Sequence, residues 1–209
     1  MRPIFLLSAA LLAAVPTSAQ PPPPILPVHD VAIEYHTSGM IPEAAGVQAN
    51  TVMVRYSHDR ERLRIDGAYG QFYAIVDIPA GRMLIIMRDQ GVYTEQPADP
   101  VIMAIFQSSN LTLRRIGEAT VSGLACTVYD TTVSQHTGRV CLTDDGVLLS
   151  AVLAEPDRRP ELEALRVTYG NQPAAWFEVP PGFRRLDMPN LPGGLNFGGG
   201  GYQGGPLGR

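Results

Sequence analysis

The sequence predicts a single-domain protein, mainly β (α+β), built on an antiparallel sheet with one short helix. Short segments that alternate between apolar and polar side chains recur through most of the 209 residues, as in half-buried strands. Glycine, aspartate and proline separate these segments at the spacing of turns. The only two cysteines, Cys126 and Cys141, lie on the two arms of one predicted hairpin.

Four parts of the chain differ in composition. Residues 1–19 begin with a positive charge, continue with an apolar run too short to span a bilayer and end on small residues, which predicts a signal peptide cleaved after Ala19. Residues 20–27 carry four consecutive prolines and predict an extended, solvated leader. Residues 28–188 form the domain, and the glycine-rich residues 189–209 predict a disordered tail. We therefore expect a soluble periplasmic or extracellular protein.

Three segments at the start of the domain predict an antiparallel meander with one polar face. Residues 30–36 place Val31 and Tyr35 on one face, between polar residues of the other. Residues 51–57 and 62–66 alternate in the same way. Such alternation is typical of a sheet with one face packed and one face solvated.

The next two predicted strands, residues 71–78 and 82–88, are apolar on both faces. A strand that is apolar on both faces must be covered on both. We therefore expect other parts of the chain to lie over this hairpin. A short strand at residues 92–95 continues the meander.

Residues 99–108 predict the covering element. Asp99 suits a helix N-cap, Pro100 suits the first helical position, and an unbroken apolar run follows. A helix that is apolar all round is buried on all sides, and ten residues give a length of about 15 Å. Two interpretations stay open: a core helix that is packed permanently, or a movable lid over a hydrophobic cavity.

Residues 111–116 and 119–121 predict strands that lead into the cysteine hairpin. A turn centred on residues 134–135 brings Cys126 and Cys141 roughly opposite each other, in a register that fits a cross-strand disulfide. In an exported protein the oxidising compartment favours this bond. A loop of this size contributes about 3 kcal/mol to stability.

Strands and turns are predicted through the end of the domain. Residues 147–153 form the return strand of a second hairpin after an Asp-Asp-Gly turn. Residues 155–160 are a polar connection, and residues 162–169 are a further strand. Residues 176–183 predict a closing strand and turn.

Composition and motifs exclude several chemistries. All 16 basic residues are arginine, which excludes catalysis by lysine. The net charge of −4, with interspersed signs, favours neither a nucleic-acid nor an anionic-membrane partner. The sequence contains no nucleophile elbow, phosphate loop or dinucleotide motif. The four histidines are His29, His36, His58 and His136, and none lies at metal-ligand spacing from another histidine or a cysteine.

These absences predict a non-enzymatic protein with no catalytic residues, no metal site and no cofactor. Serine, histidine and aspartate are all present, so a hydrolase with a triad assembled by the fold stays open as a third hypothesis.

Five pieces of the sequence, taken in order, resemble a family of uncharacterised secreted bacterial domains. The fold of that family is similar to the periplasmic lipoprotein carriers of the LolA and LolB type. The pieces are residues 30–35 (DVAIEY), 76–83 (VDIPAGRM), 119–129 (ATVSGLACTVY), 140–147 (VCLTDDGV) and 177–183 (FEVPPGF).

The resemblance implies a strongly curved antiparallel sheet that forms a half-barrel, with a short helix covering its concave side. The carriers use such an apolar interior to shield acyl chains. This chain has only one clear helical segment, and no residue matches a specific carrier contact, so lipoprotein transport itself is not implied.

Two hypotheses about function follow. In the first, the curved sheet binds an apolar or acyl-chain ligand, with a lipid, an acyl chain or a lipoprotein as partner. Its pocket would be lined by Ile85, Met87, Ile102, Ile105 and Phe106. In the alternative, the same residues pack into each other, and the protein is a ligand-free structural or interaction domain of the cell envelope. The sequence leaves the oligomeric state open.

Overall fold

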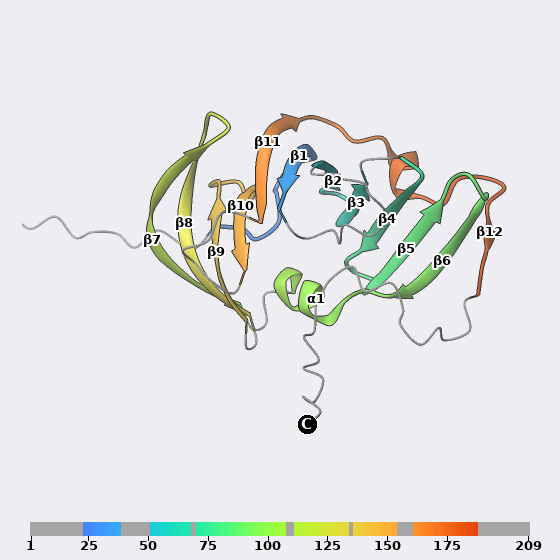
Figure 1. The fold of residues 1–209 in the computed structure, drawn as a ribbon, viewed down its shortest axis with the longest axis horizontal. Coiled ribbons are helices and arrows are strands. Elements are labelled where there is room, and N and C mark those ends of the chain that lie inside the picture. The colour runs from blue at the N-terminus through green and yellow to red at the C-terminus, as the bar shows by residue number, and fades with distance from the viewer. Residues whose placement is uncertain are drawn as a thin grey trace, which may run out of the picture.

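The computed structural model describes residues 23–38, 51–67, 70–107, 111–133, 136–153 and 161–187. Within these ranges the chain forms one open, curved sheet of twelve strands (Figure 1). The predicted signal peptide and tail lie outside them. No helix in the described part is both long and apolar enough to cross a membrane. The strands are β1 (Val31–Thr37), β2 (Thr51–Ser57), β3 (Arg62–Asp66), β4 (Phe72–Asp77), β5 (Arg82–Met87), β6 (Val92–Pro97), β7 (Leu111–Val121), β8 (Leu124–Val133), β9 (His136–Leu142), β10 (Leu148–Leu153), β11 (Leu162–Tyr169) and β12 (Arg184–Arg185).

Two antiparallel meanders make up the sheet. The first runs from β1 to β6 and the second from β7 to β11, and antiparallel pairing of β1 with β11 joins them. The prediction of a mainly antiparallel β protein is therefore confirmed. One strand does not follow the predicted antiparallel pairing: β12 pairs in parallel with β6. The pairing is parallel because the chain reaches β6 by a crossover and not through a hairpin.

The observed strand boundaries agree closely with the predicted ones, except in β7 and at the end of the domain. The strands expected at 51–57 and 162–169 are β2 and β11, with the same bounds. The two strands expected between residues 111 and 121 are one strand, β7, with an irregular register between Arg115 and Gly117. The expected closing strand at 176–183 is wrong, because the chain forms a 3-10 helix, η1 (Ala174–Phe177), and then β12.

The larger apolar cluster lies on the concave face of the sheet. Val31, Ile33 and Tyr35 of β1 point into it, as the alternation of that strand predicts. Val147 and Leu149 join them from the other meander, and both are fully buried. The cluster therefore packs the two meanders against each other across the β1–β11 junction.

A seven-residue helix, α1 (Pro100–Phe106), lies on the concave side in Figure 1 and carries the chain from β6 to β7. Its Met103 is buried in the concave cluster, and its Phe106 packs against that cluster. A helix thus forms within residues 99–108, but it is shorter than expected.

The disulfide between Cys126 and Cys141 is confirmed, although the two residues are not directly opposite. Cys141 pairs with Val128, so the cysteines are diagonal neighbours on one face. Their Cα atoms lie 5.5 Å apart. Strand twist is the physical reason, since it brings one diagonal pair of residues closer than the other.

The last residues of the predicted leader pack against the sheet, which differs from the expected solvated segment. Leu26 contacts the concave cluster and Pro27 is buried. The backbone N–H of Val28 donates to the carbonyl of Asp145 at 3.0 Å. A Cβ on Gly146 would lie 2.4 Å from the carbonyl oxygen of Leu26, so glycine is required where the two segments cross.

Replacing Gly146 with alanine is expected to lower the free energy of unfolding by about 2 kcal/mol. The φ of +86° at Gly146 strains an L-residue, and the added methyl also displaces the backbone of Leu26. Gly123→Ala is the matched control, since its φ is +79° and its Cβ would meet no atom within 4 Å. Urea denaturation measures both variants, and equal losses would contradict the proposed contact.

Because Tyr56 is buried in the concave cluster, the free energy of unfolding is expected to fall at alkaline pH. Burial raises the pKa of the Tyr56 phenol to about 12, with a smaller contribution from Glu61 and then Asp30. The unfolded phenol ionises near pH 10. The stabilisation from the neutral form is therefore complete below pH 10 and is lost as the pH rises to about 12.

Urea unfolding of wild type and Tyr56→Phe, measured from pH 9 to pH 12, checks this expectation. The variant should lose less stability over this interval. Burial also raises the pKa of Tyr169 to about 12, so this phenol should contribute a second loss of stability over the same interval. Adding Tyr169→Phe to Tyr56→Phe should therefore reduce the dependence of stability on pH further. Parallel curves for wild type and Tyr56→Phe would show that Tyr56 is not the titrating group.

Candidate functional site

The convex face of β3 to β6 carries a second, smaller apolar cluster, formed by Tyr73, Ile75, Leu84 and Ile86. Residues 174–183, which we call the C-terminal belt, lie over it, and Val179 and Phe183 of the belt pack against the cluster. The hairpin that the sequence predicts to be apolar on both faces is therefore packed on both faces. The sequence predicts only residues 99–108 as a cover, so this second covering segment is a finding of the structure.

Two arginines of β3 hold the belt by its main chain. Arg62 donates from Nη1 to the carbonyl of Phe177 at 3.2 Å, and Arg64 donates from Nη1 to the carbonyl of Trp176 at 3.1 Å. The Phe177 side chain is fully buried beneath them. Asp30 holds the chain just before the belt, because its carboxylate accepts from the backbone N–H of Gln172 at 2.8 Å. The belt is thus held by hydrogen bonds to its main chain as well as by its apolar side chains.

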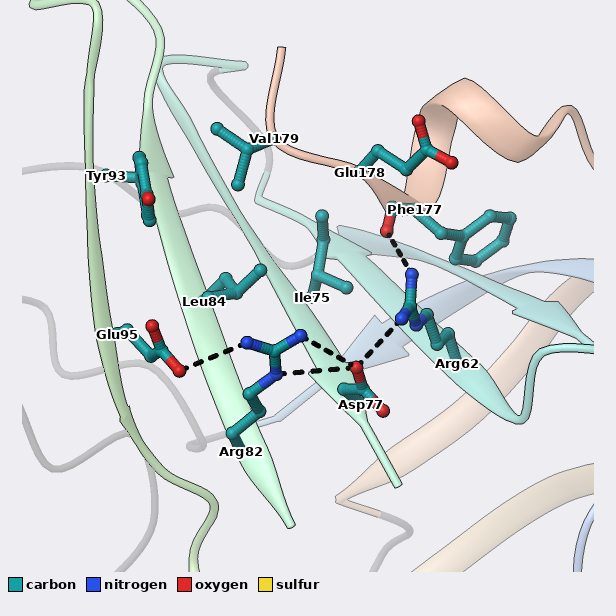
Figure 2. Close-up of a pocket in the computed structure, with 10 residues that line it drawn as sticks. All are labelled: Arg62, Ile75, Asp77, Arg82, Leu84, Tyr93, Glu95, Phe177, Glu178 and Val179. Atoms are coloured by element: carbon teal, nitrogen blue, oxygen red, sulfur yellow. Dashed lines mark hydrogen bonds and ion pairs between the residues drawn. The ribbon is translucent and has the colours of Figure 1, made fainter. Parts of the chain in front are cut away.

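A pocket of about 190 Å³ opens between the belt and β4 to β6. Such a volume falls below the roughly 300–1,000 Å³ of ordinary small-molecule sites. Figure 2 shows polar side chains along the strands and apolar side chains between them and the belt. The lining residues are Arg62, Ile75, Asp77, Arg82, Leu84, Tyr93, Glu95, Phe177, Glu178 and Val179.

Asp77 is the centre of an ion-pair network on this face (Figure 2). Its carboxylate accepts from Arg62 at 2.9 Å and from Arg82 at 3.3 Å. Arg82 also reaches Glu95 at 3.1 Å, and Arg185 approaches the other oxygen of Glu95 at 2.9 Å. Hydrogen bonds to Glu95 and then Asp77 hold the pKa of Arg82 above its usual value. The network joins β3, β4, β5, β6 and β12 into a fixed surface.

Beside this pocket, three arginines surround one carboxylate. Arg64 donates to Asp66 from Nη2 at 2.6 Å, Arg88 donates to it at 3.2 Å, and Arg55 forms a third ion pair. We call Arg55, Arg64 and Arg88 the arginine cluster. Arg64 lies 3.7 Å from the ring centroid of Tyr73 and Arg55 lies 4.8 Å from that of Trp176, both within cation–π distance.

The sequence contained one signal of these networks. Arg62, Arg64 and Asp66 alternate along the predicted polar face of β3. Alternation places them on one face, but their partners come from strands far along the chain and could not be deduced from it.

Of the five residues predicted to line an apolar pocket, the structure describes the side chains of three. Ile85 is buried, and Met87 and Phe106 are half-buried. Ile85 and Met87 alternate with Leu84 and Ile86, so they face away from the pocket of Figure 2. The side chains of Ile102 and Ile105 lie outside the described part, and a ligand in this place stays a prediction.

Histidine, cysteine, aspartate and glutamate side chains in the described ranges form no group of three or more that could hold a metal ion. The backbone N–H of His58 donates to the Asp30 carboxylate at 2.7 Å. The sequence predicted no site residue on the convex face, although it placed Arg62, Arg64 and Asp66 on one polar face; the structure shows the arginine cluster and the pocket beside it there.

No family model matches the chain, and no curated protein matches it. Among solved structures, an uncharacterised conserved protein from Thermus thermophilus is similar at TM-score 0.47 and 9% identity, over 76% of this chain and 90% of that one. The Pseudomonas aeruginosa MucA/MucB complex is similar at TM-score 0.42 and 17% identity, over 69% of this chain and 53% of that one. MucB bound to periplasmic MucA reaches TM-score 0.44 and 18% identity, over 76% and 57% of the two chains. This chain thus spans just over half of the MucB chains, and likenesses of this size carry no argument about function.

Proposed function

We propose that this chain is an exported, non-enzymatic domain that binds another protein through the convex face of its sheet. The observation that carries the proposal is the exposed aromatic and arginine surface beside the C-terminal belt. Trp176, the only tryptophan, is 39% exposed, and Arg55 stacks on it. The side chain of Arg88 is 43% exposed. Tryptophan, tyrosine and arginine are the residues most enriched in binding hot spots.

Rigidity of this surface supports the proposal. The belt is held by Arg62 and Arg64 through main-chain carbonyls, and the side chains below it are linked by ion pairs. Side chains that are already fixed lose little conformational entropy when a partner binds. A fixed arginine and tryptophan surface is therefore better prepared for a protein than flexible surface arginines are.

The concave side offers the second candidate function, an apolar or acyl-chain ligand beneath α1. It is favoured by the packing of Met103 and Phe106 against the concave cluster, and by the resemblance to the LolA and LolB carriers. Against it, Val31, Val147 and Leu149 are fully buried by neighbours in this cluster. A cluster filled by its own side chains needs no ligand.

Mass spectrometry of mature protein purified from its own periplasm without detergent separates the two candidates. An organic extract without stoichiometric lipid, from a protein that also fails to take up a fluorescent fatty acid, supports the interaction domain. A stoichiometric lipid that is lost in a folded Phe106→Asp variant would replace it with the ligand carrier. The intact mass also tests export, because cleavage after Ala19 leaves Gln20 at the N-terminus.

Site-specific cross-linking in producing cells tests the proposed binding face. A photoreactive amino acid in place of Trp176 should give one defined protein adduct. The matched control is the same replacement at Leu165 of β11, which is 51% exposed and should not give that adduct. Identical adducts from both positions would contradict a binding site at the belt. Turnover of a chromogenic ester, lost on replacing one serine or histidine, would contradict the non-enzymatic assignment.

A further inference from the structure

We infer that the partner presents a short acidic segment, whose carboxylates bind Arg55 and Arg88 while an apolar side chain beside them contacts Trp176. This inference rests on the proposed function and names the chemistry of the partner. It follows from the charge, the unused donors and the exposure of the arginine cluster.

Charge in the cluster is not balanced. Three guanidinium groups surround Asp66, so the four side chains together carry a net charge of +2. The neighbouring network differs, because three carboxylates there face three arginines and the charges cancel: Asp77 and Glu95 pair with Arg62, Arg82 and Arg185, and Asp187 also pairs with Arg185. Unbalanced positive charge held in one place attracts an anionic group.

Asp66 cannot satisfy the donors around it. A carboxylate has about four lone-pair sites, and each arginine has five N–H donors. Arg64 alone occupies both oxygens of Asp66, through Nε at 3.0 Å to each and Nη2 at 2.6 Å. Within the described residues, Arg55 and Arg88 each donate one side-chain hydrogen bond, to Asp66. Most of their donors are therefore available to a second carboxylate in the forked geometry that arginine favours.

Exposure divides the cluster into a support and a binding edge. The Arg64 side chain is 10% exposed and the Asp66 side chain 15%, whereas Arg55 is 23% exposed and Arg88 43%. Rings hold both outer guanidiniums in place, since Arg55 stacks on Trp176 and Arg88 lies 4.9 Å from the ring centroid of Tyr73. A ligand would meet two fixed cations and an exposed indole together.

A peptide fits this arrangement better than a polyanion does. The whole chain carries a net charge of −4, so an extended anionic surface such as nucleic acid or an anionic membrane is repelled beyond the cluster. A short segment with two carboxylates needs only the local positive charge. An apolar residue next to them would bury part of Trp176, which supplies affinity that charge alone does not.

The test uses the mature protein and a short fluorescein-labelled peptide of alternating glutamate and serine with a central phenylalanine. Binding is followed by fluorescence polarisation at low salt. The test variant is Arg55→Gln/Arg88→Gln, which leaves Asp66 paired with Arg64 and should therefore still fold. Thermal unfolding checks this. The matched control is Arg114→Gln/Arg115→Gln, which removes two exposed arginines from β7.

The acidic peptide should bind wild type and the β7 control alike, and the Arg55/Arg88 variant at least tenfold more weakly. The same peptide with glutamine in place of glutamate should not bind. An equal loss in both double variants would overturn the inference, because it would show a response to overall charge. No binding to wild type, or binding to phosphatidylglycerol vesicles that depends on Arg55 and Arg88 more strongly, would also overturn it. If the protein is at the same time free of lipid and cross-links at Trp176, the proposed function stands and only the acidic partner fails.

Discussion

Replacing Phe177 with alanine is expected to lower the free energy of unfolding by about 3–5 kcal/mol. The side chain is fully buried, and among the described residues it is the largest of the fully buried side chains. Its removal takes away the apolar contacts that fix the middle of the C-terminal belt. Chemical denaturation in urea, followed by circular dichroism, measures the loss.

The neighbouring aromatic residue is the matched control for this result. Trp176→Ala removes a larger ring, but one that is 39% exposed, so its cost should stay below about 1 kcal/mol. Phe177→Leu keeps most of the volume and should recover much of the stability. If the two alanine variants were equally stable, Phe177 would not be the anchor of the belt.

Removing the disulfide has the second-largest expected effect, about 3 kcal/mol. Cys126 and Cys141 are separated by 15 residues, and the bond lies in the concave cluster, with both residues buried. The bond restricts the unfolded chain, so the double variant Cys126→Ala/Cys141→Ala should unfold at lower urea concentration.

Reductant supplies the control for the disulfide. Dithiothreitol should lower the stability of wild type by a similar amount and leave the double variant unchanged. Mass spectrometry of alkylated samples verifies that the bond has been reduced. A reduced wild type that is as stable as the oxidised protein would contradict the prediction.

For the two ion-pair networks of the convex face, the sequence predicts which residues share a face but not which residues they pair with. Arg62, Arg64 and Asp66 could be placed on one face from the alternation of β3. Their partners Asp77 and Arg88 lie on or beside other strands, and pairing register decides which side chains meet. Register depends on contacts along the whole sheet, so the charge balance of each cluster was not predictable.

The C-terminal belt is the part of the domain where the prediction is most clearly wrong, because the pattern of its residues is typical of a strand. Trp176, Phe177, Val179 and Phe183 are apolar or aromatic, as in a strand, but Pro173 precedes them and Pro180 and Pro181 interrupt them. Prolines lack the N–H that a ladder needs, and that was the available signal. The apolar convex face of the hairpin was a second signal, since it required another segment of the chain to cover it.

By itself the sequence determined the β class, most strand boundaries, the short helix and the disulfide partners. Each of these follows from local periodicity, from capping and turn residues, or from having only two cysteines. Only the tertiary structure decided the joining of two meanders through β1 and β11, the diagonal position of Cys126 and Cys141, and the path of the belt over the convex face. The physical reason is that side-chain alternation records which face is buried, while the identity of the neighbour across that face depends on residues distant in the chain.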